Sequence, residues 1–417
     1  MSVEKRIRRL QASSPFYAQQ LQQHPDWIDW LDKPKNRDFD FRYCALEELW
    51  SREQRGDGFS LEALRRFRRR MSLRIAYREL NGLASVASSW KELTLLAEFV
   101  LHRLCEWRHA EMTRELGVPY YAHTGQPATY CIFALGKLGA GELNFCSDLD
   151  LIFAFEGDGP CRKDGTATEL STREFYDRFF HALASDLTAN SPDGALYYLD
   201  LRLRPQGEHS PIARSVEGLA DHYWTYGQTW ERLAWLRGRP VAGCAELGHE
   251  VLEDMNPFRY PRYAPTNITR EVASVKVRTE KEVPAGELER DIKTGPGGIR
   301  EIEFIAHALL LTHGGKNPFL QTHSTLAAYE KLAWYGIIDR ADAHYLERAY
   351  FWLRRLENRL QMRGETPRHS LPASEDDRHW IAESMDLPSP ESFENTLAEW
   401  RAGVRQRYEA HMAIGEE

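Results

Sequence analysis

The chain has 417 residues, of which 42% are hydrophobic and 28% are charged, a composition typical of a soluble globular protein of two or three packed units. The formal net charge of −8 excludes a general nucleic-acid-binding protein, although a local basic cleft stays open. No stretch approaches the roughly 20 apolar residues that a membrane span needs, so we expect no membrane contact.

The cysteines and the first residues bear on location. The six cysteines form no CxxC pair and no cluster with His at zinc-ligand spacing, which is typical of reduced thiols. The basic residues Lys5, Arg6, Arg8 and Arg9 precede no apolar segment, so the N-terminus does not resemble a signal peptide. We therefore expect a cytoplasmic protein.

Residues 1–117 indicate a helical region. Apolar residues recur at helical spacing from Leu61 to Leu83, and again from Trp90 to Leu116. The first of these stretches also holds five arginines, which we expect to form a solvated helix face: Arg65, Arg66, Arg68, Arg69 and Arg70.

Residues 118–250 form a second unit, in which the pattern changes to short β-rich runs. Strands are predicted over 129–135, 149–155 and 195–204, the last ended by Pro205, with an amphipathic helix over 174–187. Three strands and an intervening helix indicate a small α/β domain over about residues 118–215.

Residues 251–417 read as a helical domain. The segment Pro257–Tyr263 interrupts the pattern and is interpreted as a linker. Helices are then predicted over 268–283, 299–311, 326–332, 343–362 and 390–412. The expected fold class is α+β and mostly helical, with an α/β domain between N-terminal helices and a C-terminal helical bundle.

The run Gly136–Phe153 contains the strongest chemical signal, an acidic pair. On a strand, Asp148 and Asp150 share one face, while Leu149, Leu151 and Phe153 share the other. Neighbouring carboxylates repel each other and raise each other's pKa unless a cation relieves them. Because magnesium takes carboxylate, phosphate and water oxygens, the pair predicts a magnesium site.

The third strand extends this site. Its polar residues Asp200, Arg202 and Arg204 alternate with leucines, so Asp200 is a candidate third ligand beside two guanidiniums that suit phosphate oxygens. Three carboxylates can hold two metal ions about 3.5–4 Å apart, which clamp the attacking and leaving oxygens of phosphoryl transfer.

The segment before the pair is a candidate phosphate-binding loop. Gly136, Gly139 and Gly141 allow backbone amides to approach a phosphate, and Lys137 adds a positive charge. Ser147 completes the Ser-Asp-x-Asp ending of this loop. The alternative is an ordinary turn with two surface aspartates.

A second candidate site lies at Gly295–Phe304, where glycines lead into a helix whose free N-terminal amides favour anions. Arg300, Glu303 and His307 fall near one face of this helix. Either Glu301 or Glu303 could bind a metal-bound water or a protein substrate. The alternative is a glycine-started helix with a solvated face.

The acidic motif resembles the polymerase-β type of nucleotidyltransferase, with a strand, a glycine turn, Asp-x-Asp and a later Asp. More narrowly, the sequence resembles glutamine synthetase adenylyltransferase, a family of enzymes that add and remove AMP on a glutamine synthetase tyrosine. The segments that carry this resemblance are Leu64–Arg68, Leu73–Tyr77, Leu135–Phe153, Asp200–Pro205, Trp230–Arg232, Pro257–Tyr263, Gly297–Phe304 and Leu353–Leu360.

The resemblance implies a polymerase-β-like nucleotidyltransferase domain over residues 118–250 and a role in nitrogen-assimilation control. Family members contain two nucleotidyltransferase halves, and this chain, with one acidic motif, is similar to the N-terminal, deadenylylating half. We therefore expect the half that transfers AMP from ATP to be absent. Where the family commonly carries Lys-Ala-Arg after Trp-Glu-Arg, this chain has Arg237-Gly-Arg, which leaves a nucleotide contact by Arg237 in doubt.

The resemblance also implies a reaction and its participants. Phosphate would attack the AMP phosphorus on the adenylylated tyrosine and release ADP, with Mg²⁺, as two ions, held by Asp148, Asp150 and Asp200. Glutamine synthetase is the expected protein substrate, and a PII signal protein is a further possible partner. The alternatives are AMP transfer from ATP, uridylyl transfer to PII, and a non-catalytic regulatory module.

Overall fold

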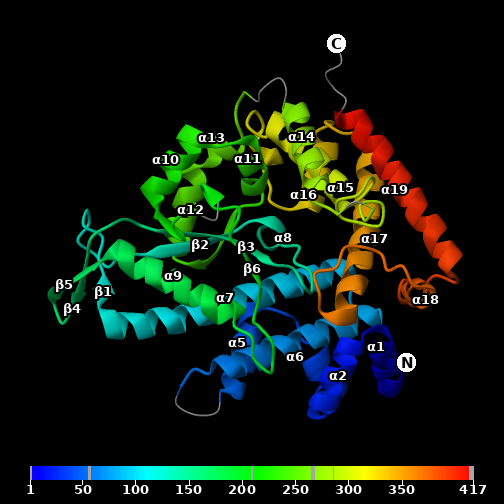
Figure 1. Ribbon diagram of the computed structural model, residues 1–417, viewed down its shortest axis with the longest axis horizontal. Coiled ribbons are helices and arrows are strands. Elements are labelled where there is room, and N and C mark those ends of the chain that lie inside the picture. The colour runs from blue at the N-terminus through cyan, green and yellow to red at the C-terminus, as the bar shows by residue number, and fades with distance from the viewer. Residues whose placement is uncertain (1, 55–57, 208–209, 264–267, 285, 413–417) are drawn as a thin grey trace.

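Helices make up most of the computed structural model, which describes residues 2–54, 58–207, 210–263, 268–284 and 286–412 (Figure 1). The mostly helical α+β class expected from the sequence is confirmed. None of the helices in these ranges combines the length and apolar character that crossing a bilayer requires.

The N-terminal region consists of helices, and the two long ones begin at serine caps. The two long helices start after Ser60 and Ser85, whose side chains accept hydrogen bonds from amides of the first turn. The helices are α1 Val3–Ser13, α2 Pro15–Gln23, α3 Asp26–Asp32, α4 Pro34–Arg37, α5 Tyr43–Glu53, α6 Leu61–Leu80 and α7 Val86–Leu116.

The middle region contains the sheets. The main sheet has the order β6-β3-β2-β8, with β7 also on β3, and a smaller sheet has the order β1-β4-β5. The elements are β1 Val118–Pro119, β2 Tyr130–Ala134, α8 Gly136–Ala140, β3 Leu149–Phe155, β4 Pro160–Lys163, β5 Thr166–Ser171, α9 Thr172–Thr188, β6 Leu199–Asp200, β7 Ala213–Ser215, α10 Val216–Tyr226, α11 Thr229–Trp235, β8 Arg239–Gly243, α12 Ala245–Asp254 and α13 Asn256–Arg259.

The C-terminal region is helical, and Figure 1 shows it beside the sheet, with α17 running down toward the N-terminal helices. Its elements are α14 Ile268–Glu280, α15 Ile299–His313, the short 3-10 helix η2 Pro318–Leu320, α16 Thr325–Trp334, α17 Arg340–Gly364, α18 Glu375–Ser384 and α19 Pro390–Met412. Helix α17 contacts both α2 and α15, so it joins the first helices to the last ones.

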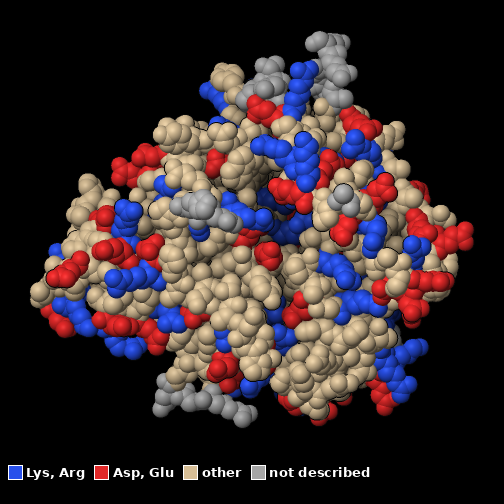
Figure 2. Space-filling model, viewed as in Figure 1, with Lys and Arg blue, Asp and Glu red and all other residues tan. Residues whose placement is uncertain are grey.

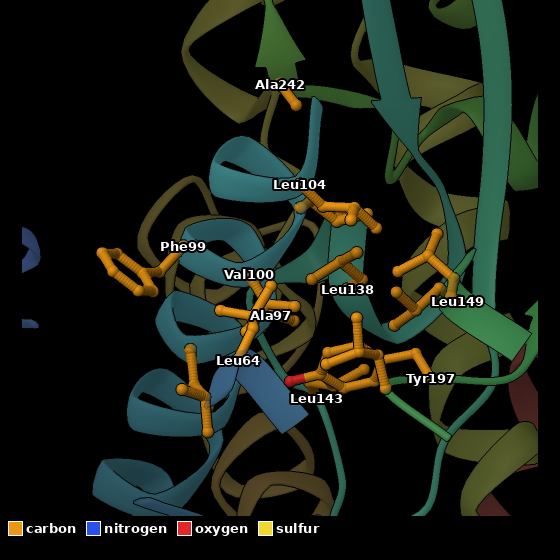
Figure 3. Close-up of a cluster of buried hydrophobic side chains, with 14 of the residues drawn as sticks. Leu64, Ala97, Phe99, Val100, Leu104, Leu138, Leu143, Leu149, Tyr197 and Ala242 are labelled. Carbon is orange, nitrogen blue, oxygen red and sulfur yellow. The ribbon is translucent and has the colours of Figure 1, made fainter. Parts of the chain in front are cut away.

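The hydrophobic core that supports the sheet is shared with the N-terminal helices. Figure 3 shows Leu138, Leu143 and Leu149 directed toward side chains of α7 such as Ala97 and Val100. The alternation predicted for residues 148–153 is confirmed, because Leu149 and its same-face neighbours are fully buried. The domain boundaries at residues 117 and 250 remain predictions.

The third strand is much shorter than predicted. Only Leu199–Asp200 pairs with β3, and residues 201–207 fold into turns, with positive φ at Gln206 and Gly207. One reason lies on β3, because β7 pairs with the same edge of that strand from Phe153 onward and leaves no partner for β6 beyond residue 202. The alternating leucines are therefore not evidence of a strand beyond Asp200.

Two further expectations are wrong. Three of the arginines assigned to a solvated face, Arg65, Arg68 and Arg69, are buried, where they donate to backbone carbonyls and to Glu365. The predicted linker over 257–263 begins inside α13, and its Phe258 is fully buried. In both cases a segment that looks polar or irregular is covered by a distant part of the chain.

Candidate functional site

Two carboxylates are held in register at one end of the main sheet. In the parallel pair of β3 and β6, Asp150 lies opposite Asp200. Asp148 directly precedes β3 and is exposed. Since Leu149 is anchored in the core between them, Asp148 and Asp150 project to the opposite face, away from α7.

The electrostatics of the two paired carboxylates differ. Burial, and then the charge of Asp200, raise the pKa of Asp150 to about 6. Burial also raises the pKa of Asp200, but hydrogen bonds from Arg202 outweigh it and hold that pKa below its ordinary value. The Nη2 atom of Arg202 lies 2.6 Å from Oδ2 of Asp200. Asp150 therefore carries a repulsion that an added cation would relieve.

Gly136 packs so closely against Asp150 that no side chain fits between them. Its φ is +53°, and a Cβ atom added there would lie 1.9 Å from Oδ2 of Asp150. Any larger residue would both strain the backbone and displace the carboxylate. The sequence predicts that Gly136 lets the backbone approach a phosphate. In the structure it lets the backbone approach the Asp150 carboxylate.

The segment after Gly136 is not the open loop that the sequence indicates. Residues 136–140 form helix α8, in which the Gly139 amide donates to the Leu135 carbonyl. A Cβ at Gly139 would collide with the Ala134 and Arg237 carbonyls, so this glycine serves close packing. Gly141 ends α8 with φ +75° and open space around it.

Lys137 points into the protein. It is buried, and its Nζ lies 2.5 Å from Oε1 of Glu357 on α17. Burial lowers the pKa of Lys137 to about 7, although the Glu357 carboxylate opposes that shift. The ammonium predicted to bind phosphate is therefore occupied by an internal carboxylate.

Of the remaining residues predicted to bind phosphate, two line the cavity at the aspartates and one does not. Ser147 and Arg202 line a cavity of about 310 Å³ together with Asp148, Asp150 and Asp200. Arg204 lines neither this cavity nor its neighbour, and its Nε donates to the Gly207 carbonyl at 3.0 Å.

The carboxylate cavity continues into a larger one. The second cavity, of about 500 Å³, shares Gly136, Asp200 and Arg237 with the first, and it is also lined by the Trp230 side chain and by residues of α14 and α15. Figure 2 shows Lys and Arg side chains gathered in a hollow near the centre of this face, with Asp and Glu around it. The acidic pair thus lies in a cleft of mixed charge.

The face of α15 predicted from helical spacing meets this cleft. Arg300, Glu303 and His307 all line the larger cavity. Glu301 does not, because it is fully buried on the other side, with Oε1 2.9 Å from Lys276 Nζ and 2.7 Å from an Arg405 nitrogen. The structure therefore brings Arg300 and Glu303, but not Glu301, to the acidic residues.

The expectation of free amides at the start of α15 is wrong. The amides of Ile299 and Arg300 donate to the carbonyls of Ile292 and Lys293, and that of Gly297 donates to Glu301 Oε2. The glycine turn itself packs on α19, since a Cβ at Gly297 would lie 2.1 Å from the Arg401 carbonyl oxygen. Any anion bound here must use side chains.

Glu303 and Arg237 form a buried pair at the junction of the two cavities. Their oxygen and nitrogen atoms lie 3.1 Å apart, and Arg237 also donates to the Thr325 hydroxyl at 3.0 Å. Although burial opposes it, the charge of Arg237 and of neighbouring cations lowers the pKa of Glu303 to about 2. Burial lowers the pKa of the adjacent His307 to about 3, so this imidazole is neutral.

Sequence reasoning missed several residues of the cleft. Lys293, Pro367 and His369 line the carboxylate cavity, and Arg278 and Glu282 line its neighbour. Lys293 could have been found, because it lies two residues before the glycine turn that was singled out. His369 could not, since only the return of the chain after α17 brings it to this cavity.

Whether a metal ion fits this cavity depends on which carboxylate oxygens are free to bind it. Among the described residues, no group of three His, Cys, Asp and Glu side chains could hold a metal ion as it stands. Asp200 is engaged by Arg202, which leaves the oxygens of Asp148 and Asp150. Two carboxylates completed by phosphate and water oxygens fit magnesium, and the raised pKa of Asp150 marks where positive charge is lacking.

Comparison with known families gives two matches that together cover most of the chain. A family model described as glutamate-ammonia ligase adenylyltransferase matches residues 4–254. A second, described as GlnD PII-uridylyltransferase, matches residues 267–412. The first match contains the three aspartates, and the second contains Lys293 and α15.

Curated relatives match over most of this chain. Proteins named bifunctional glutamine synthetase adenylyltransferase/adenylyl-removing enzyme are 35% identical in Pseudomonas aeruginosa and 38% in Stenotrophomonas maltophilia, over 82% and 84% of this chain. One from Nitrosococcus oceani is 35% identical over 83%. The matched parts are 34%, 37% and 36% of those proteins, so the chain spans about a third of the relatives' length.

Proposed function

Because the chain belongs to the glutamate-ammonia ligase adenylyltransferase family, we propose that it is a magnesium-dependent nucleotidyltransferase that acts on glutamine synthetase. The direction that we propose is removal of AMP from an adenylylated tyrosine by phosphate. The observation that carries this proposal is the register of Asp150 and Asp200 in a cleft that is also lined by Arg202, Lys293 and Arg300.

The proposed reaction breaks the phosphate ester bond between AMP and tyrosine and forms the phosphoanhydride bond of ADP. An oxygen of hydrogen phosphate forms a bond to the AMP phosphorus, and the bond from that phosphorus to the tyrosine oxygen breaks. The tyrosine oxygen keeps the electron pair and takes the proton that hydrogen phosphate carried. The products are ADP and free tyrosine.

The chain's own residues would position the reactants. Asp148 and Asp150 supply carboxylate oxygens for Mg²⁺, which when bound neutralises charge on the phosphoryl oxygens. The ion pair with Arg202 keeps Asp200 ionised beside them. The larger cavity, with Trp230, Leu233 and Phe304 in its lining, offers an apolar wall for a nucleoside.

The protonation states favour removal over addition. Phosphate is already an anion near pH 7, so its attack needs no strong base. A tyrosine hydroxyl with a pKa of about 10 must instead lose a proton before it attacks ATP. In that direction a neighbouring carboxylate or the bound metal ion would have to help remove the proton.

The test is phosphorolysis by this chain alone. Adenylylated glutamine synthetase is incubated with Mg²⁺ and phosphate, and ADP release is measured for the wild type, for Asp150→Asn and for the surface control Lys91→Met. We expect phosphate-dependent ADP from the wild type and the control only. ATP consumption with unmodified glutamine synthetase would instead establish the forward direction. No turnover and no Mg²⁺-dependent nucleotide binding would leave a regulatory module.

Uridylyl chemistry is the second candidate, favoured by the match of residues 267–412 to the PII-uridylyltransferase model. The same carboxylates would serve it, because metal-assisted nucleotidyl transfer does not depend on the base. Presenting a UMP-modified PII protein beside AMP-modified glutamine synthetase separates the two. Release of uridine nucleotide from PII, with none of ADP, would replace our proposal.

A further inference from the structure

The basic side chains that line the carboxylate cavity fall into two groups. Three are already matched with acidic partners inside the protein, in the pairs Lys137–Glu357, Arg202–Asp200 and Arg237–Glu303. The other two, Lys293 and Arg300, make no side-chain hydrogen bond or ion pair with the residues that the structure describes. Their charges are therefore available to a ligand.

The acidic side chains of the cavity divide in the same way. Asp200 and Glu303 are paired with arginines, whereas Asp148 and Asp150 form no ion pair with a residue that the structure describes, although Lys293 lines the same cavity. The cavity thus has an unmatched acidic pole and an unmatched basic pole. A bound cation satisfies the first, and an anion is required for the second.

The backbone fixes the two cations relative to each other. The amide of Arg300 donates to the carbonyl of Lys293 at 2.9 Å. The Asp291 carboxylate accepts from the amides of Lys293 and Thr294 at 2.8 and 2.7 Å, which locks the turn before them. Since α15 and this turn pack against α19, the backbone positions from which the two side chains extend are fixed.

The position of each cation is also informative. Lys293 lines the carboxylate cavity together with Asp148, Asp150 and Asp200, so it lies on the side of the acidic pole. Arg300 lines both cavities and therefore lies at their junction. An anion between these two side chains would be adjacent to a phosphoryl group held at the carboxylates.

We propose that Lys293 and Arg300 form the binding site for the inorganic phosphate that attacks the AMP phosphorus. This inference rests on the proposed phosphorolysis. Hydrogen phosphate approaching an anionic AMP group is repelled, and two unmatched cations offset that repulsion while they orient one oxygen toward phosphorus. Lys137, the lysine that the sequence favours for this role, is a positioning residue held by Glu357.

The kinetic test varies phosphate and adenylylated glutamine synthetase separately. Lys293→Met and Arg300→Met should each raise the KM for phosphate by about ten- to hundredfold, the loss expected for a charge-assisted hydrogen bond, with the KM for the protein substrate little changed. Lys293→Arg and Arg300→Lys should recover part of the affinity. The control Lys91→Met, on an exposed position of α7, should match the wild type.

A binding test separates this proposal from the proposed function. Inorganic phosphate should raise the melting temperature of the wild type and of Lys91→Met, but much less that of Lys293→Met and Arg300→Met, whether or not the chain releases ADP. If the wild type releases no ADP but phosphate still stabilises it more than Lys293→Met and Arg300→Met, only the proposed phosphorolysis is overturned. Equal phosphate binding by wild type and both variants, or a fall in kcat with the KM for phosphate unchanged, would overturn the phosphate site.

Discussion

The Nζ atom of Lys137 lies 2.5 Å from Oε1 of Glu357, which ties the short helix beside the acidic pair to a residue 220 positions further along the chain. Glu357 is fully buried and also contacts Arg354 Nε at 3.0 Å and His369 Nδ1 at 2.9 Å. One carboxylate thus connects α8, α17 and the segment after it.

Removing that carboxylate should be more damaging than removing the lysine. Glu357→Gln leaves Lys137 and Arg354 buried without their anion, and we expect it to lower the free energy of unfolding by about 3–5 kcal/mol. Lys137→Met should lower the free energy of unfolding less, because Glu357 still contacts Arg354 and His369. Urea unfolding of both variants measures the difference, with the exposed Glu48→Gln as a control near zero. Equal losses for the two would contradict this network.

Asp150→Asn should abolish activity and stabilise the fold. In the folded state the carboxylate has a pKa of about 6, against about 3.9 when unfolded, so the native state binds the extra proton between these values. Stability contributed by that group is lost as pH rises through this window. At pH 7.5 the variant should be more stable by about 2–3 kcal/mol, and most of the gain should vanish near pH 4.

Thermal unfolding at the two pH values measures this effect. Asp148→Asn is the matched comparison, since its exposed carboxylate should give a smaller gain. Mg²⁺ should raise the melting temperature of the wild type and not that of Asp150→Asn. If Asp150→Asn is no more stable than the wild type at pH 7.5, charge repulsion at Asp150 does not destabilise the fold. If the variant keeps full activity, Asp150 is not part of the active site.

Gly136→Ala should inactivate the site through geometry alone. The new Cβ would displace the Asp150 carboxylate, and we expect activity to fall by about a hundredfold or more, as small misplacements of reacting groups do. Gly141→Ala is the control, because Gly141 also has a positive φ but lies in open space, so the variant carries backbone strain without the collision. Similar activity in the two alanine variants would show that contact with Asp150 does not matter.

His307 should contribute to acid sensitivity. It stays neutral in the fold down to a pKa of about 3, because it is buried and lies near Arg237, whereas the unfolded chain takes up a proton below about pH 6.5. The unfolded state binds more protons in this window, so stability is lost as pH falls from 6.5 toward 3. Between pH 7 and 5, the wild type should lose about 1–2 kcal/mol more than His307→Asn.

Chemical unfolding at pH 7 and pH 5 provides the comparison for His307. His181→Asn, a change on the exposed surface of α9, should leave the pH dependence of the wild type intact. If His307→Asn loses as much stability as the wild type over this interval, the imidazole is not the group that resists protonation.

The sequence by itself determined the features that depend on local periodicity. The alternation of Asp148, Leu149 and Asp150 predicts which side chains face the core. Because Leu149 is buried on one face of the strand, the two aspartates must lie on the opposite face. The spacing of Arg300, Glu303 and His307 likewise predicts one side of a helix. The mostly helical α+β class follows from the same periodicities, summed over long segments.

Only the tertiary structure decided which charges are free. Lys137 directly follows Gly136 and Lys293 lies two residues before Gly295, so residue spacing alone does not decide which lysine is available to phosphate. The difference arises because α17 returns to the sheet and places Glu357 against Lys137, whereas Lys293 lines the carboxylate cavity without an ion pair to any described residue. A buried charge takes whichever partner the packing of distant helices supplies, so the available phosphate ligand is set by long-range contacts that residue spacing does not encode.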